Sequence, residues 1–378
     1  MRDDLRLGTI AGIPVGISWG LVVIVGAFTW LLASSRWPVT QPDLPTSAYW
    51  SAGFAAAALL FFSVLIHELG HAVVARRKEV GVEGITLWAL GGATHLRNDS
   101  PNPGSELQIA AAGPLASVGV GVAFAGAYQL WSAVADPGLT GSVLRWLAIV
   151  NIALAVFNLL PALPLDGGRI LAAAAWKVTG NRSTGTRVGA GVGRAMGVAL
   201  MAFGVYESFV WSSTGGVWTA AIGWFIFGAA THERERAAVT DRLADKSVAD
   251  LMLRDVPVAE DWMTVETFRA HLAQDSVDSS HELFGVRAFD GSITAVVTSE
   301  ALDRVPEASR AYVRVLQIAE PATSVPRVEP TDAVTDALAD HEELRVRPIA
   351  VVDHAGRLVG SIGPAQLLAA GARDRAGA

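Results

Sequence analysis

Residues 62–71 read Phe-Ser-Val-Leu-Ile-His-Glu-Leu-Gly-His, an H-E-x-x-H motif at the end of an apolar run. On a helix, His67 and His71 are four residues apart and share one face, so both imidazoles can reach one metal ion. Glu68 stands beside that metal as a candidate general base. Residues 53–66 carry no charge. The sequence therefore predicts a metal centre on a helix that lies within a lipid bilayer.

The composition divides the chain into two parts. Hydrophobic residues make up 51% of the chain and charged residues only 17%, and most of the charges follow residue 231. We expect a membrane domain over 1–231, a linker over 232–246 and an aqueous domain over 247–378. The net charge of −7 gives no support for nucleic-acid binding. Because the chain has no cysteine, a zinc site would need histidine and carboxylate ligands.

Several apolar segments are long enough for membrane spans, which need about 20 residues each. We expect six transmembrane helices, at about 14–34, 50–75, 106–131, 140–160, 187–210 and 215–231. Lys and Arg are concentrated in the loops that share a side with both termini, whereas the opposite loops hold little beyond Arg36 and Arg145. The positive-inside rule then predicts a multi-pass protein of the cell membrane with cytoplasmic N- and C-termini.

A third metal ligand is needed, because two histidines leave Zn²⁺ short of the three protein ligands typical of a catalytic site. Asp166 is the best candidate among the few acids of the apolar part. It follows a span that ends at two prolines and precedes a Gly pair that permits a tight turn. An ionisable group at membrane depth is costly and needs a partner, for which zinc is the natural choice. Asn158, in the same segment, either hydrogen-bonds the attacked carbonyl or its oxyanion, or caps its own helix end.

The proposed chemistry requires Glu68. Zinc lowers the pKa of its bound water toward about 7, and a nearby carboxylate takes the proton and passes it to the leaving amine. We expect one zinc ion per chain. A chance match to the short motif is the alternative, but three ionisable groups within five residues of a span are costly in lipid without a purpose. His95 is different, since a lone histidine in an expected β-hairpin or loop is more often structural than a ligand.

These motifs resemble the site-2 protease family of intramembrane zinc metalloproteases. The resemblance rests on the H-E-x-x-H motif late in the second span and on residues 158–169, which read N-x-x-P-x-x-P-L-D-G-G-R. Residues 12–15, Gly-Ile-Pro-Val, precede the first span, and the Gly113–Pro114 pair lies in the third, as is common in the family. A Gly-Gly-containing β segment between the second and third spans is a further shared feature. The resemblance covers residues 7–231.

The resemblance implies cleavage of a transmembrane or membrane-proximal peptide within the bilayer, often in regulated intramembrane proteolysis. His67, His71 and Asp166 would be the zinc ligands. Glu68 would be the base and Asn158 an oxyanion or substrate contact. A membrane-spanning protein would be the substrate and the lipid bilayer the environment.

Two stripes of small residues recur at four-residue spacing on the third and fifth spans, at Gly113, Ser117, Gly121 and Ala125, and at Gly189, Gly193 and Gly197. Such faces let helix backbones approach closely in lipid. Close packing is the expected role of both stripes, and admission of a substrate helix is the alternative.

Residues 247–372 consist of two copies of a unit in which strands and helices alternate, an order that resembles a tandem CBS pair (cystathionine-β-synthase domains). Such pairs commonly bind adenine nucleotides through a G-x-x-T/S-x-x-D pattern. In the first copy Thr298 supplies the hydroxyl but Ala301 takes the acidic position, and in the second Gly363 and Gln366 replace hydroxyl and acid. These departures count against ribose binding of the usual kind and favour a regulatory, substrate-gating or dimerisation role, with a homodimer formed through the pair.

The expected fold is thus a multi-pass α-helical membrane protein with short β segments, followed by an α/β CBS pair. The expected function is that of an intramembrane zinc endopeptidase. The alternative is a CBS-regulated channel or transporter in which the histidines line an ion path. Transporters usually show two matching halves with broken helices, and residues 14–231 show no such repeat. A catalytically inactive homologue is a third interpretation, against which the intact motifs count.

Overall fold

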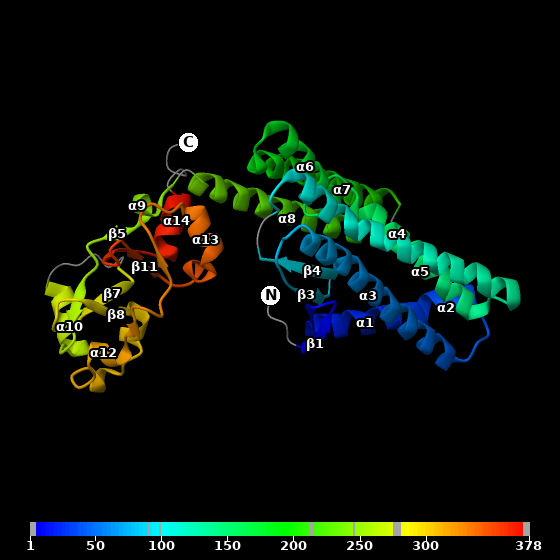
Figure 1. Cartoon of the computed structure of the whole chain (residues 1–378). Coiled ribbons are helices and arrows are strands. Elements are labelled where there is room, and N and C mark those ends of the chain that lie inside the picture. The colour runs from blue at the N-terminus through cyan, green and yellow to red at the C-terminus, as the bar shows by residue number, and fades with distance from the viewer. Residues whose placement is uncertain are drawn as a thin grey trace. The chain divides into compact units, whose positions relative to one another are not determined.

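The computed structural model describes residues 5–89, 91–97, 100–211, 215–244, 246–274 and 281–372. The chain forms two compact units, Met1–Ala237 and Ala238–Ala378 (Figure 1). Their boundary lies inside helix α8 (Gly215–Ala244). Most of the segment expected as a linker is therefore a continuation of this helix.

Five helical segments of the described residues are long and apolar enough to cross a membrane, namely Trp19–Thr40, α3 (Thr46–Arg77), α4 (Pro103–Val134), α5 (Gly138–Asn158) and α7 (Arg182–Val210). The first combines α1 (Trp19–Leu31), a π-helical turn (Leu32–Arg36) and α2 (Trp37–Thr40). It begins later than expected, because residues 13–17 form a strand. The expected sixth span is the first part of α8. It is not among the five, since Gly, Trp and Thr residues lower its mean hydropathy and charged residues follow, so a sixth crossing stays a prediction.

Large apolar side chains cover the outer faces of these helices. Val23, Leu115 and Phe209 are 73%, 68% and 84% exposed, respectively. Soluble proteins rarely expose apolar surface on this scale, whereas helices that contact lipid tails require it. The exposed faces therefore agree with a multi-pass membrane protein.

A four-stranded sheet covers the part of α3 that carries the H-E-x-x-H motif. Its strands are β1 (Leu5–Ile10), β2 (Ile13–Ile17), β3 (Val82–Trp88) and β4 (Gly91–Leu96), in the order β1-β2-β3-β4. The central pair β2–β3 is parallel and the outer pairs are antiparallel. β4 is thus an edge strand, and it packs against α3. His95 lies in the β3–β4 hairpin, where its Nε2 is 3.1 Å from the hydroxyl of Thr86, as the structural role predicted for it requires.

The loop between α5 and α6 (Asp166–Thr179) is held by close backbone packing. The two prolines lie in this non-helical segment, as expected, and the Leu163–Pro164 bond is cis. A Cβ atom on Gly193 of α7 would lie only 2.2 Å from the carbonyl oxygen of Leu163, and one on Gly197 would lie 2.8 Å from the carbonyl oxygen of Gly223 in α8. The second stripe of small residues therefore lets α7 pack directly against the loop and against α8, as predicted for close packing.

The second unit contains the predicted repeat, as two sheets of four strands each. Their orders are β6-β7-β8-β9 and β10-β11-β12-β5. In each sheet the first pair is parallel and the next two pairs are antiparallel. The bounds are α9 (Val248–Leu251), β5 (Leu253–Arg254), β6 (Val258–Glu260), α10 (Val265–Gln274), β7 (Leu283–Arg287), β8 (Ile293–Thr298), α11 (Ser299–Asp303), α12 (Val315–Ile318), β9 (Glu320–Pro321), β10 (Arg327–Val328), α13 (Val334–Asp340), β11 (Ile349–Val352), β12 (Leu358–Ile362) and α14 (Pro364–Ala372).

The two copies exchange their outermost strands. β9 opens the second copy but pairs with β8 of the first, and β5 opens the first copy but pairs with β12 of the second. Each sheet packs on its own cluster of buried apolar side chains, with Phe268 at the centre of one and Ile349 in the other. This architecture resembles a CBS pair, as the repeated order of strands and helices predicted.

Candidate metal centre

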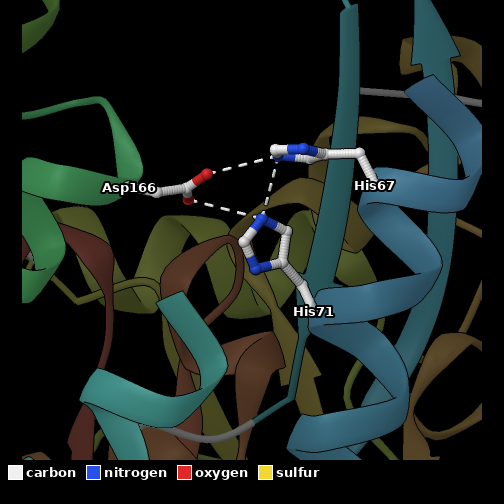
Figure 2. A group of neighbouring side chains, drawn as sticks. All are labelled: His67, His71 and Asp166. Carbon is white, nitrogen blue, oxygen red and sulfur yellow. Dashed lines mark hydrogen bonds and ion pairs between the residues drawn. The ribbon is translucent and has the colours of Figure 1, made fainter. Parts of the chain in front are cut away.

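Three predicted ligands converge from two helices that are distant in the sequence. His67 and His71 lie on one face of α3, and Asp166 is the first residue of α6 (Figure 2). Nε2 of His67 is 3.2 Å from Oδ2 of Asp166, and Nε2 of His71 is 3.3 Å from Oδ1. The two Nε2 atoms are 3.2 Å apart. All three side chains are buried.

These separations fit a zinc ion. Zinc bonds of about 2.0–2.1 Å in a tetrahedral arrangement place the ligand atoms roughly 3.3 Å from one another. Two neutral imidazoles and one carboxylate are also a donor set that zinc prefers. Without a cation, two imidazole nitrogens facing each other and a buried carboxylate would be poorly satisfied. The described residues thus form a site that can hold one zinc ion.

The position of Asp166 depends on the Gly pair that follows it. A Cβ atom on Gly167 would lie 2.2 Å from the carbonyl oxygen of Leu159, and one on Gly168 would lie 2.1 Å from the nitrogen of Leu163. The loop therefore folds over the first turn of α6, which only glycine permits at these two positions.

Helix α4 supplies a hydrogen-bond partner to each histidine. Nδ1 of His71 lies 2.7 Å from the backbone oxygen of Ile109, and Nδ1 of His67 lies 2.9 Å from the hydroxyl of Ser117. A carbonyl oxygen only accepts, so Nδ1 of His71 carries the proton and Nε2 is free for the metal. For His67 to bind a metal through Nε2, its proton must likewise lie on Nδ1, which then donates to the hydroxyl of Ser117. Such partners commonly fix the ring orientation of metal-binding histidines.

Gly113 lies directly against the two histidines. A Cβ atom at this position would be 2.2 Å from Nε2 of His71 and 2.6 Å from Nε2 of His67. The expected role of the first stripe of small residues was close helix packing, with admission of a substrate helix as the alternative. The structure assigns two of its members, Gly113 and Ser117, to the surroundings of the metal site. One feature of the sequence could have indicated this role. Ser117 places a hydroxyl one helical turn after the Gly113–Pro114 pair in an otherwise apolar span.

Glu68 is buried next to the ligands and faces strand β4. The hydroxyl of Thr94 donates a hydrogen bond of 2.7 Å to its Oε2 atom. Gly92 is so close that a Cβ atom there would lie 2.3 Å from Cγ of Glu68. The candidate base is therefore enclosed between α3 and the edge strand.

One cavity of about 910 Å³ joins all five predicted site residues. Asn158 contributes to its wall from the last turn of α5. Among the residues that the structure describes, none is hydrogen-bonded to the side chain of Asn158. The structure therefore gives no support to the alternative that Asn158 caps its own helix. Its position in the cavity wall agrees with contact to a substrate.

An ion pair that the sequence reasoning missed ties the first turn of α6 to α4. Both Nε and Nη2 of Arg169 lie 2.9 Å from Oε1 of Glu106, and the hydroxyl of Ser100 donates to the other carboxylate oxygen. Arg169 is one turn after Asp166 and lines the same cavity. The sequence did contain signals for this ion pair, namely an acid, Glu106, at the start of an apolar span and an arginine, Arg169, directly after the Gly pair.

Comparisons with known proteins agree with this geometry. The model of "Peptidase family M50" matches residues 55–136 and 126–203. The "Putative zinc metalloprotease Rip3" of Mycobacterium tuberculosis is 38% identical over 367 residues, which cover 97% of this chain and 92% of that protein. The "Putative zinc metalloprotease sll0528" of Synechocystis sp. is 28% identical and covers 97% of this chain and 95% of its own length.

A solved structure, the site-2 protease from Methanocaldococcus jannaschii, is also similar. It has a TM-score of 0.43 and 27% sequence identity, covering 61% of this chain and 94% of its own. The identity to the mycobacterial protein extends over both units, well beyond the short H-E-x-x-H motif. This chain therefore belongs to peptidase family M50, the site-2 protease family, and is a zinc metalloprotease of the membrane.

Proposed function

We propose that this protein is an intramembrane endopeptidase that hydrolyses peptide bonds of membrane-spanning substrates. One observation carries the proposal. The donor atoms of His67, His71 and Asp166 have the mutual spacing that zinc requires, and Glu68 adjoins them in the same cavity. Family membership supports hydrolysis over the alternative of a histidine-lined channel or transporter.

Each site residue has a role in the proposed reaction. Zinc, when bound, supplies a Lewis acid that polarises the scissile carbonyl and acidifies water. Glu68 accepts a proton from the attacking water and returns it to the leaving nitrogen as the C–N bond breaks. General acid–base catalysis of this kind contributes about 10²–10⁴-fold. The burial of Glu68 excludes bulk water that would otherwise compete for the proton.

Asn158 is proposed to stabilise negative charge on the carbonyl oxygen. Its amide lies in the cavity wall, and the NH₂ group donates two hydrogen bonds. A donor placed toward the developing oxyanion lowers the barrier more than it stabilises the ground state. Asn158 thus complements Glu68, because Glu68 transfers the proton and Asn158 stabilises the negative charge on the carbonyl oxygen.

The substrate must be extended at the cleaved bond, since a helix engages its carbonyl groups in internal hydrogen bonds. Edge strand β4 lines the catalytic cavity from Gly91 to Leu96. An edge strand presents unpaired backbone groups with which an extended peptide can pair. We therefore assign β4 as the surface against which the unwound substrate segment lies.

The second unit is proposed to be a regulatory or dimerisation module rather than a nucleotide sensor of the usual kind. At the two positions expected to contact ribose, Thr298 accepts a hydrogen bond from the nitrogen of Ala301, and Gln366 accepts one from the nitrogen of Gly363. Both side chains are thus engaged at helix starts.

Helix α8 offers a route for such regulation. Phe225, Glu233 and Arg236 of this helix line the catalytic cavity, and its later residue Leu243 is buried in the core of the second unit. We place both termini and the CBS pair in the cytoplasm, as the charge distribution predicts, and propose a role in regulated intramembrane proteolysis.

The test uses purified full-length protein, Glu68→Gln and Asp166→Ala, with a model transmembrane substrate. We expect about one zinc ion per chain in the wild type, retained zinc without cleavage in Glu68→Gln, and loss of zinc in Asp166→Ala. Mass spectrometry of metal and cleavage products measures both. Full-rate cleavage by Glu68→Gln, or a wild type without stoichiometric zinc, would refute the proposal.

A further inference from the structure

We propose that Thr94 is a positioning residue that fixes the carboxylate of Glu68 for proton transfer. The inference rests on the proposed function, in which Glu68 is the base. It adds a residue from the sheet to a site otherwise built from helices.

The hydrogen bond itself is the first observation. The Thr94 hydroxyl donates to Oε2 of Glu68 across 2.7 Å, and it also lies 3.3 Å from the backbone oxygen of the same residue. A distance of 2.7 Å is the common length of a hydrogen bond from a hydroxyl to an oxygen acceptor, and such a bond is about twice as strong when the acceptor is an ionised carboxylate. Oε2 is therefore held by the protein, whereas the described residues form no hydrogen bond with Oε1.

A glutamate needs such a restraint. The last torsion of its side chain is broad and roughly two-fold, so packing alone does not fix the plane of the carboxylate. Proton transfer requires the accepting oxygen within hydrogen-bond reach of the donor. A hydroxyl bound to one oxygen selects one orientation of the carboxylate at each turnover.

Gly92 restrains the same side chain from the same strand. A Cβ atom at position 92 would lie 2.3 Å from Cγ and 2.9 Å from Oε1 of Glu68. The backbone of β4 is thus in contact with the stem of the glutamate, while Thr94 holds its end. Two residues of one edge strand, both in the cavity wall, define where the carboxylate lies.

The matched control comes from the neighbouring strand. Thr86 of β3 is buried, and its hydroxyl pairs with His95. It does not line the catalytic cavity, so Thr86→Val removes a threonine hydroxyl from the same sheet without touching Glu68.

The experiment compares Thr94→Val, Thr94→Ser and Thr86→Val in full-length protein. For Thr94→Val we expect kcat to fall about 10–100-fold with KM and zinc content unchanged. Thr94→Ser keeps the hydroxyl and should lie within a few-fold of wild type, as should Thr86→Val. Unchanged kcat in Thr94→Val, an equal loss in Thr94→Ser, or a loss explained by missing zinc would overturn the proposal.

Inhibitor binding gives a readout that does not depend on turnover. The probe is a peptide hydroxamate, which chelates zinc and donates a hydrogen bond to the adjacent carboxylate. Thr94→Val should weaken its binding about tenfold in the wild-type background and not in the Glu68→Gln background, as coupled residues require. Equal weakening in both backgrounds contradicts positioning through Glu68. If instead Glu68→Gln cleaves at full rate, the proposed function itself fails. Failure of the positioning role of Thr94 and failure of the proposed function are thus distinguished by different variants.

Discussion

The hydroxyl of Ser117 in α4 lies 2.9 Å from Nδ1 of His67, within hydrogen-bond distance, and both side chains are almost fully buried. The contact joins the third span to the ligand face of the second. When Nε2 of His67 binds a metal, the hydroxyl of Ser117 can accept the hydrogen bond from Nδ1 and hold the ring in its orientation.

Removing this hydroxyl should weaken metal binding. For Ser117→Ala we expect zinc affinity to fall about 10–100-fold, the usual cost of losing an outer partner of a metal-binding histidine. Competition with a chelator of known affinity measures the change. Ser132→Ala on the same helix is the control, because the exposed hydroxyl of Ser132 donates to the backbone oxygen of Gln129 on its own helix. Equal zinc affinity in the two variants would show that Ser117 does not support His67.

A methyl group at position 113 should disrupt the site. In Gly113→Ala the new Cβ would meet both Nε2 atoms, so we expect zinc content to fall below half of the wild-type value and cleavage to fall in proportion. Gly126→Ala is a matched control on α4, because a Cβ there meets nothing within 4 Å. Metal analysis together with circular dichroism separates loss of zinc from unfolding. Stoichiometric zinc in Gly113→Ala would contradict the assigned packing.

The packing of α7 against the ligand loop can be tested in the same manner. Gly193→Ala places a Cβ 2.2 Å from the carbonyl oxygen of Leu163, and overpacking of this kind typically costs about 1–3 kcal/mol. We expect a lower Tm and weaker zinc binding, since the loop leads directly into Asp166 at the start of α6. Gly191→Ala, whose Cβ meets nothing within 4 Å, should match the wild type. Thermal unfolding in detergent compares the pair.

Asn158 should affect turnover and not metal binding. For Asn158→Ala we expect kcat to fall about 10²–10³-fold, as for other oxyanion donors, with zinc content and Tm unchanged. If Asn158 only capped α5, Tm would fall and kcat would be nearly preserved. Steady-state kinetics and thermal unfolding of one preparation distinguish the two roles.

The positions of the ligands followed from the sequence because few ionisable residues occur in its apolar part. His67, His71 and Asp166 each needed a partner in lipid, and one shared cation would satisfy all three. The segment of Asp166 was also marked by two prolines and a Gly pair, which the structure shows at the end of α5 and the start of α6.

Other features depended on tertiary packing. The sequence did not reveal that Ser117 faces His67 or that Thr94 reaches Glu68, because both contacts join segments whose relative rotation is set only after packing. The first span was placed too early for a local reason. Its apolar start, Ile13–Ile17, pairs as a strand with β1 and β3. Apolar residues in a strand and in a span look alike until their pairing is known.

The exchange of β5 and β9 between the two copies has a practical consequence for dissecting the protein. A truncation between the copies would leave β5 without β12 and expose the edge of β8 once β9 is removed. Leu243, Val248 and Ile349 share one buried cluster, so the end of α8 belongs to the same cooperative unit. The C-terminal half can be removed or transplanted only as a whole, and the cut must fall within α8 before Leu243.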